Sequence, residues 1–198
     1  MPRILITAFK PYDQWQSNAS WLALMEMMRD FPSGQTITTR LYPVDFAAAR
    51  DQLARDLQDN YDYALHLGQA PGSSRLRLET TAINIAVDGP QPENFRPLVA
   101  EGPAAYRADF PFGEWTQQLR AAGVPANVSF HAGTYLCNGV FYLSHYLAET
   151  LAVKTRSLFI HVPLDVTQTV GLAADTSCLP TALTARGLRI VVDELNRV

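Results

Sequence analysis

The sequence predicts an α/β fold, specifically a three-layer α/β/α sandwich around a mostly parallel central sheet. Short apolar segments of strand length alternate along the chain with longer segments of helical periodicity. Helices that follow strands in this way cover both faces of a parallel sheet. The length of 198 residues fits one domain, 1–198, and we find no repeat or linker within it.

Each element can be assigned from its own pattern. The expected strands are short and rich in apolar or β-branched residues: 4–9, 36–41, 63–67, 127–130 and 157–162. The expected helices are 18–28, 46–57 with Asp45 as N-cap, 114–122, 138–153 and 180–197. Segment 75–86 predicts two strands or one bent strand. Segment 87–112, rich in proline and glycine, predicts a long ordered loop, and such loops are usually functional.

The composition excludes several classes of function. Hydrophobic residues make up 47% of the chain, charged residues 18%, and the formal net charge is −3. Without a block of basic residues, we expect no nucleic-acid interface. No apolar run approaches the ~18 residues of a membrane span, and the first run is too short for a signal peptide. We therefore expect a cytoplasmic protein that does not bind a membrane.

Cysteine and histidine spacing argues against metal chemistry. The two cysteines cannot form a disulfide framework, and no histidine pair has the close spacing of zinc ligands. The loop Gly68-Gln-Ala-Pro-Gly72 follows a strand but lacks the Lys-Ser/Thr of a phosphate-binding loop. The sequence thus predicts neither a metal site nor a nucleotide site.

Cys137 is the strongest candidate nucleophile. It immediately precedes the helix expected from about Asn138, where free N–H groups and the helix dipole favour a thiolate. The same N–H groups could hold an oxyanion. The alternative is an inert packing cysteine, which is common. Cys178 is expected to be a surface or packing thiol.

His161 and Glu79 could complete a catalytic set with this cysteine. His161 ends the strand 157–162, and it reaches the edge of the sheet near Cys137 if that strand neighbours the strand 127–130. Glu79 lies within an apolar run, where an unpaired carboxylate would be costly. It could orient the imidazole, or it could face solvent from an edge strand. His161 could likewise be a strand-end histidine without catalytic function.

Six segments in register together resemble the pyroglutamyl peptidase I family, a family of cysteine peptidases also called pyrrolidone-carboxylate peptidases. They are Ile4-Leu-Ile-Thr-Ala-Phe-Lys-Pro-Tyr12, Gly68-Gln-Ala-Pro-Gly72, Glu79-Thr-Thr-Ala-Ile-Asn84, Gly102-Pro-Ala-Ala-Tyr106, Ala132-Gly-Thr-Tyr-Leu-Cys-Asn138 and Phe159-Ile-His-Val-Pro163. The resemblance covers nearly the whole chain, is weakest after about Leu164, and is most specific around Cys137.

The resemblance implies an activity and a set of site residues. It implies removal of an N-terminal pyroglutamyl residue from peptides with a blocked N-terminus, with Cys137, His161 and Glu79 as nucleophile, base and acid. It implies that Phe9 and Tyr12 clamp the lactam ring, and that groups near Gln69 and Leu136 contact its amide. It further implies a cytoplasmic enzyme without metal or cofactor that forms a homo-oligomer, either a tetramer or a dimer.

Several positions depart from the family pattern around the expected pocket. Tyr12 stands where phenylalanine is usual, and its hydroxyl needs a partner if it is buried. Pro90 stands where the family usually has an arginine near the active site. The sequence also has Ala8, Asp13-Gln14, Ser73 and Gly139 at positions that usually hold other residues. Arg75, Arg77 or Arg96 could replace the missing arginine.

These departures leave three hypotheses open. The first is an active peptidase for pyroglutamyl or a similar small neutral acyl group. The second is a divergent member of the family that binds such a ligand, or a protein partner, with little catalysis. The third is a cysteine amidohydrolase for another small lactam or amide.

Overall fold

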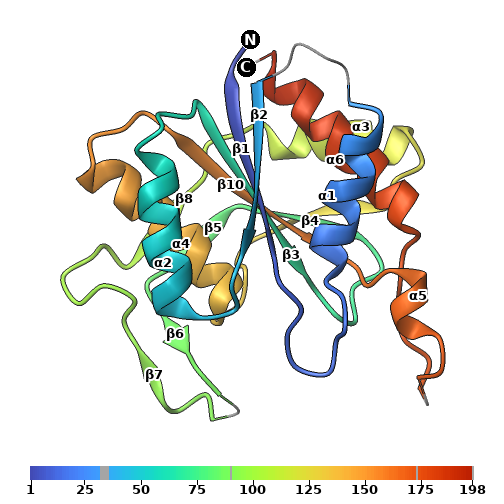
Figure 1. Ribbon diagram of the computed structural model, residues 1–198, viewed down its shortest axis with the longest axis horizontal. Coiled ribbons are helices and arrows are strands. Elements are labelled where there is room, and N and C mark those ends of the chain that lie inside the picture. Colours follow the sequence, from blue (N-terminus) through green and yellow to red (C-terminus); the bar gives the residue numbers. More distant parts are fainter. Residues whose placement is uncertain (32–35, 90, 173, 198) are drawn as a thin grey trace.

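A six-stranded mixed sheet in the order β2-β1-β3-β10-β4-β9 lies at the centre of the computed structural model, which describes residues 1–31, 36–89, 91–172 and 174–197 (Figure 1). Its strands are β1 (Arg3–Phe9), β2 (Thr36–Tyr42), β3 (Tyr63–Gln69), β4 (Leu76–Glu79), β9 (Ala126–Ser129) and β10 (Arg156–Val162). The first four in spatial order are parallel. β4 pairs antiparallel with β10 and parallel with β9. The predicted α/β class with a mostly parallel sheet is confirmed.

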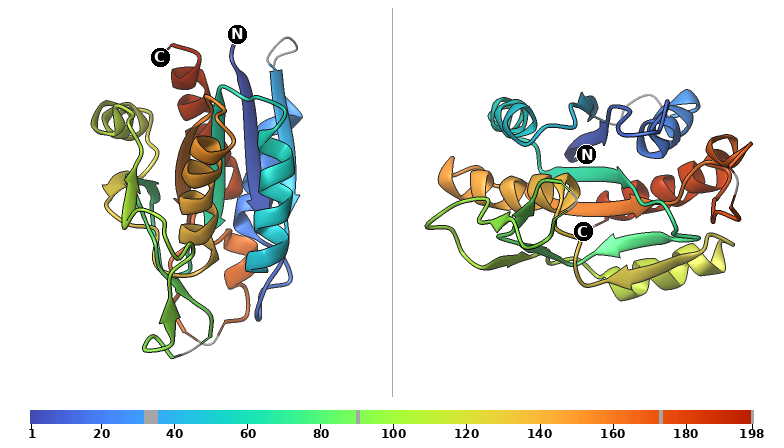
Figure 2. Two further views of the ribbon diagram at one scale, coloured as in Figure 1. Left: turned by 90° about the vertical axis from the view of Figure 1, so that its left-hand side faces the viewer. Right: turned by 90° about the horizontal axis from the view of Figure 1, so that it is seen from below.

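Helices cover both faces of this sheet, as predicted. Seen from below, α2 (Phe46–Leu57) and α4 (Leu136–Thr150) lie on one side, and α1 (Ala19–Arg29), α3 (Phe112–Ala121) and α6 (Thr181–Leu195) lie on the other (Figure 2). Asp45 is the N-cap of α2, and its carboxylate accepts a 2.8 Å hydrogen bond from the Ala48 N–H. One continuous hydrophobic cluster joins the layers, from Ile4 to Leu195.

The segment after β4 forms small strands beside the sheet. β5 (Thr81–Ile83) pairs with β8 (Ala105–Arg107), and β6 (Ala86–Val87) pairs with β7 (Phe95–Arg96). Segment 75–86 therefore contains β4, β5 and the first residue of β6, rather than the expected two strands or one bent strand. The expected loop 87–112 contains β7, β8 and the first residue of α3. Pro90, within it, lies outside the described residues.

One premise of the sequence argument is wrong. Strand β9 does not neighbour β10, because β4 lies between them, and β9 runs in the opposite direction to β10. The carboxyl end of β9 therefore does not lie at the edge of the sheet where β10 ends. A period-2 apolar pattern carries no information on strand order or direction, so the sequence argument gave the neighbouring of these strands only as a condition, and this condition is not met. The start of α4 reaches the end of β10 through residues 130–135.

Candidate active site

Cys137 lies within the first turn of α4, not just before the helix as expected. Tyr135 is the N-cap and makes no side-chain capping bond, and the first intrahelical bond runs from the Gly139 N–H to the Tyr135 carbonyl. The N–H groups of Leu136, Cys137 and Asn138 therefore have no acceptor within the helix. These free donors lie in the same turn as Cys137, as an oxyanion site requires.

The pairing of β10 and β4 brings His161 and Glu79 together. In this antiparallel pair Phe159 lies opposite Glu79, and His161 lies two residues further along the same face. The His161 Nδ1 is 2.8 Å from the Glu79 Oε1. Glu79 is fully buried on an interior strand, so the alternative that it faces solvent from an edge strand is wrong.

Contacts with two acidic groups keep His161 protonated near neutral pH. Burial alone lowers the pKa of this imidazole. The charge of Cys137, a hydrogen bond to it, and the contact with Glu79 outweigh burial and raise the pKa of His161 to about 9. Because Nδ1 is bonded to Glu79, the nitrogen left for the thiol is Nε2. The arrangement is a cysteine–imidazolium pair with a buried carboxylate behind it.

Gly68 provides the space in which the thiol sits. A Cβ at this position would lie 2.7 Å from the Cys137 Sγ and 2.7 Å from the Phe159 Cζ, both far inside normal contact distance. Strand β3 can therefore pass beneath the Cys137 thiol only with a hydrogen at this position. The sequence argument placed Gly68 only in the loop after a strand, because a close contact between distant segments leaves no local sequence signal.

A narrow apolar pocket opens beside the thiol. Its volume is about 40 Å³, and its lining includes Phe9, Tyr12, Gln69, Leu136 and Cys137. All four residues expected to contact a lactam ring thus lie around one cavity with the expected nucleophile. A larger cavity of about 760 Å³ adjoins it and shares Tyr12, Val44 and Tyr135 as lining residues.

The Tyr12 hydroxyl is set among polar groups of this pocket. Burial and the nearby charge of Cys137 raise the pKa of Tyr12 to about 12, and the Gln69 amide, which faces the hydroxyl outside normal hydrogen-bond geometry, acts in the opposite direction. The extra hydroxyl therefore lies close to both the thiol and the Gln69 carboxamide. It occupies space that a phenylalanine would leave empty.

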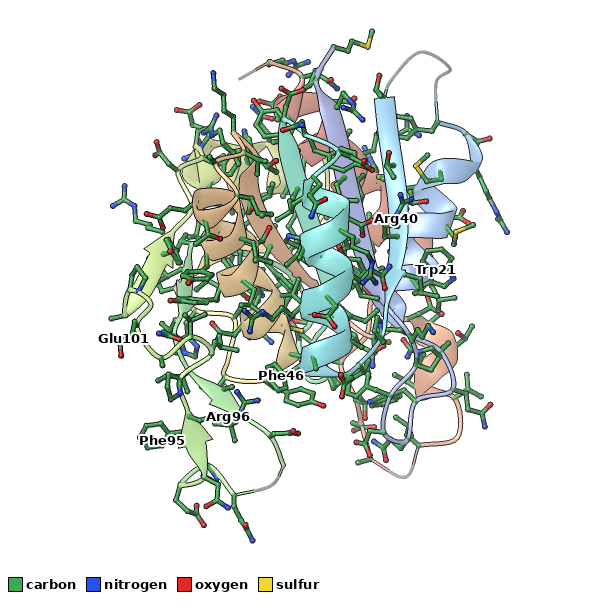
Figure 3. The ribbon with its side chains drawn as sticks, turned by 60° about the vertical axis from the view of Figure 1, so that its left-hand side comes forward. Trp21, Arg40, Phe46, Phe95, Arg96 and Glu101 are labelled. Atoms are coloured by element: carbon green, nitrogen blue, oxygen red, sulfur yellow. The ribbon has the colours of Figure 1, made fainter. Side chains whose placement is uncertain are left out.

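In the described part of the chain, none of the three arginines considered as replacements bonds to His161 or Glu79. Arg96 places its guanidinium over the Phe46 ring, 5.4 Å from the centroid (Figure 3). Arg77 lies opposite His161 in the β4–β10 register, half-buried, and Arg75 is exposed. Within the described residues, no hydrogen bond or ion pair joins any of them to Glu79 or His161.

Asn138 is a site residue that the sequence argument missed. Its side chain is fully buried, accepts from the Ile83 N–H and donates to the carbonyls of Ile83 and Ile85, each at 2.9 Å. These bonds fasten the start of α4 to the chain that continues from Glu79. A buried asparagine beside a candidate nucleophile is the only signal the sequence offers for this role.

The remaining histidines and the second cysteine lie outside the pocket. His66 is fully buried between the Thr7 Oγ1, at 2.8 Å, and the Ser144 Oγ, at 2.9 Å. Burial lowers the pKa of His66 to about 3, and burial lowers that of His145 to about 4. Cys178 lies 3.8 Å from the Thr169 Oγ1. The described residues contain no cluster of three or more His, Cys, Asp or Glu side chains that could hold a metal ion.

Comparison with known proteins places this geometry in a family. The profile of the family described as "Pyroglutamyl peptidase", Peptidase C15, matches residues 2–197. Pyrrolidone-carboxylate peptidase 1 of Ralstonia nicotianae is 37% identical over 201 residues, which cover 98% of this chain and 92% of that protein. The pyrrolidone-carboxylate peptidase of Clavibacter michiganensis is 37% identical over 179 residues, covering 86% and 83%.

Solved structures agree with this assignment. The crystal structure of pyrrolidone carboxyl peptidase from Fervidobacterium islandicum superposes with a TM-score of 0.92 at 26% identity, covering 100% of this chain and 99% of that one. The corresponding enzyme of Thermococcus litoralis gives a TM-score of 0.86 at 26% identity, covering 100% and 96%. From the profile match across nearly its whole length and relatives above 30% identity, the chain belongs to the pyroglutamyl peptidase family.

Proposed function

We propose that this chain is a cysteine peptidase that removes an N-terminal pyroglutamyl residue from peptides, with Cys137 as nucleophile, His161 as general acid and base, and Glu79 as the residue that orients His161. The observation that carries the proposal is the arrangement of these three side chains beside the pocket. The cysteine, the imidazole and the buried carboxylate lie in series, and the thiol borders an apolar pocket lined by Phe9 and Tyr12.

The pocket suits an uncharged lactam better than a free amino terminus. Pyroglutamate carries no α-ammonium, so its recognition requires apolar walls and a few amide contacts. Phe9 and Tyr12 supply the walls, and the Gln69 carboxamide and the free backbone N–H of Leu136 supply polar groups beside them. A pocket of about 40 Å³ must widen to admit the ring, so a shift of its lining accompanies binding in this proposal.

The chemistry proceeds in two steps. The Cys137 sulfur attacks the carbon of the scissile carbonyl, which joins the pyroglutamyl group to the next residue and is not the ring carbonyl. The oxyanion that forms is held by free N–H groups at the start of α4. The His161 imidazolium gives its proton to the departing amine, and a thioester remains. Neutral His161 then accepts a proton from water, hydroxide adds to the thioester carbonyl, and the thiolate leaves with free pyroglutamate as product.

Hydrolysis of a pyroglutamyl-arylamide tests this function. Wild-type protein should release the arylamine, and Cys137→Ala should abolish release while keeping the fold. Absence of turnover by the wild type would overturn the proposal and favour a member of the family that binds without catalysis. Turnover of other lactam amides, but not of this substrate, would favour the amidohydrolase hypothesis.

A cytoplasmic location and assembly into a dimer or tetramer are part of the same proposal, and they rest on the resemblance. In the described residues, no helix has the length and apolar character to cross a membrane. Light scattering after size-exclusion chromatography measures the assembly directly. A monomeric mass at micromolar concentration would contradict this part of the proposal.

A further inference from the structure

Gln69 carries a buried donor with no partner at the wall of the pocket. Its side chain is 5% exposed, and its Nε2 has no partner in hydrogen-bond geometry within the described residues, although it faces the Tyr12 hydroxyl. Its Oε1 is fully engaged, because it accepts from the Ala19 N–H at 2.7 Å and from the Gln168 Nε2 at 2.8 Å. An unpaired buried donor is costly unless a ligand supplies an acceptor.

The orientation of the Gln69 carboxamide follows from chemistry alone. The Ala19 backbone N–H can only donate, so the Gln69 atom that it contacts must be the oxygen. The NH₂ of Gln69 is then the group left without a partner, on a residue that lines the pocket. The Nε2 is itself buried beside Tyr12, so a lactam ring that widens the pocket at Tyr12 would meet this donor.

Gln168 has its own orientation set in the same way. It belongs to α5 (Val166–Thr169), whose capping box includes a 2.9 Å bond from the Asp165 backbone N–H to the Gln168 Oε1. Because that N–H can only donate, the NH₂ of Gln168 must face the other way. It donates to the Ser17 carbonyl at 3.0 Å and to Gln69. The pattern Asp165-x-x-Gln168 just after β10 is the sequence signal for this capping box.

We propose that Gln168 is a positioning residue for substrate specificity: it holds the Gln69 carboxamide so that its NH₂ donates to the ring carbonyl of a pyroglutamyl group. This inference rests on the proposed function and deepens it. A five-membered ring without that carbonyl, such as prolyl, would leave the buried donor unpaired. The hydrogen bonds between Asp165 and Gln168 and between Gln168 and Gln69 thus make recognition of the ring depend on a short helix outside the pocket.

Two substitutions at Gln168 distinguish an effect on the orientation of the Gln69 carboxamide from an effect on the stability of the fold. Gln168→Glu keeps the acceptor for the Asp165 N–H, so α5 stays capped, but its carboxylate cannot donate to the Gln69 oxygen. It would instead attract the Gln69 NH₂ and draw it away from the pocket. Gln168→Met loses the capping bond and both donors, yet it exerts no pull on Gln69, whose oxygen still accepts from Ala19.

The experiment measures KM and kcat for a pyroglutamyl-arylamide, the inhibition constant of 2-pyrrolidone, and the melting temperature. We expect KM and the inhibition constant to rise about 10-fold in Gln168→Glu, the equivalent of one lost hydrogen bond, and less in Gln168→Met, with kcat within about 2-fold of wild type in both. The melting temperature should fall in both variants, because each loses the donors to Ser17 and Gln69, and it should fall further in Gln168→Met, which also loses the capping bond. Thr167→Val serves as control, because it removes a hydroxyl bond to Asp165 without touching Gln69.

The order of the two variants decides the outcome. If the variant with the lower melting temperature, Gln168→Met, also has the higher KM, Gln168 only supports the fold and the inference is wrong. Unchanged KM in both variants, with an active wild type, also overturns it. An inactive wild type overturns the proposed function instead, and 2-pyrrolidone binding, followed by calorimetry, then still shows whether Gln168 orients the pocket.

Discussion

Replacing Gly68 by alanine tests whether the thiol must sit directly on strand β3. The new Cβ would lie 2.7 Å from the Cys137 Sγ and 2.7 Å from the Phe159 Cζ. Ordinary carbon contacts are roughly 3.5–4.0 Å, so each overlap is about 1 Å. The Phe159 ring packs between Phe141, at 5.9 Å, and His161, at 4.8 Å between centroids, so it has little room to move. The sulfur must be displaced.

A displacement of about 1 Å at a reacting atom costs roughly 100-fold in rate. We therefore expect kcat for a pyroglutamyl-arylamide to fall about 100-fold in Gly68→Ala. The free energy of unfolding should fall by about 1–3 kcal/mol, the usual cost of overpacking a core. Steady-state kinetics and urea denaturation measure the two effects on the same preparation.

Two other glycines provide matched controls. A Cβ at Gly187 would lie 2.8 Å from the Leu76 Cδ2 and 2.9 Å from the Val124 Cγ1, an overlap of similar size away from the thiol. Gly187→Ala should lose comparable stability and keep kcat. At Gly113 no atom lies within 4 Å of such a Cβ, so Gly113→Ala should lower neither kcat nor the free energy of unfolding. Equal loss of kcat in Gly68→Ala and Gly187→Ala would refute the argument, since the effect would then follow stability rather than the position of the sulfur.

Three further predictions concern titration, thiol reactivity and the pocket. The pKa of His161 is raised to about 9, so its stabilising contribution is complete below about 6.5 and is lost as pH rises to 9. The pKa of His66 is lowered to about 3, so its contribution is lost as pH falls below about 6.5. Urea denaturation between pH 4 and pH 9.5 should show maximal stability near pH 6.5. Stability that rises throughout this range would contradict the assignment for His161, and stability that falls throughout would contradict that for His66. Iodoacetamide at neutral pH should alkylate Cys137 before Cys178, because only Cys137 contacts an imidazolium, and peptide mapping that finds the reverse order would remove Cys137 as nucleophile. Tyr12→Phe should raise kcat/KM for a pyroglutamyl-arylamide several-fold, because it removes a hydroxyl that narrows the pocket and competes for the Gln69 amide. A decrease would mean that the hydroxyl contacts the substrate.

The parts of the fold that follow from local chemistry could be predicted from the sequence. The strand at 157–162, the N-cap Asp45 and the position of Cys137 near a helix start all depend on patterns within a few residues. Chemistry also identified Glu79, because a carboxylate within an apolar run requires a partner, and the structure provides one in His161.

The parts that depend on contacts between distant segments could not be predicted. The reversed direction of β4 is what brings Glu79 to His161, yet four residues of strand pattern do not encode direction. Gly68 and Asn138 act through segments far away in the sequence, at Cys137 and at Ile83. Gln168 lies where the resemblance to the family is weakest, and only its capping-box spacing marks it.

The position of β10 in the sheet determines when the chain gains activity as it folds. β10 is the last strand to be synthesised, yet it pairs with β3 on one side and β4 on the other. A nascent chain that ends before Arg156 holds two separate groups of strands with open edges, which are sites of aggregation. Only β10 can join them, and such long-range pairing is slow. Because the same strand carries His161, the step that completes the sheet also places the imidazole beside Glu79 and Cys137. No folding intermediate that lacks β10 can therefore cleave a peptide by this mechanism, and proteolytic activity arises only when the sheet is complete.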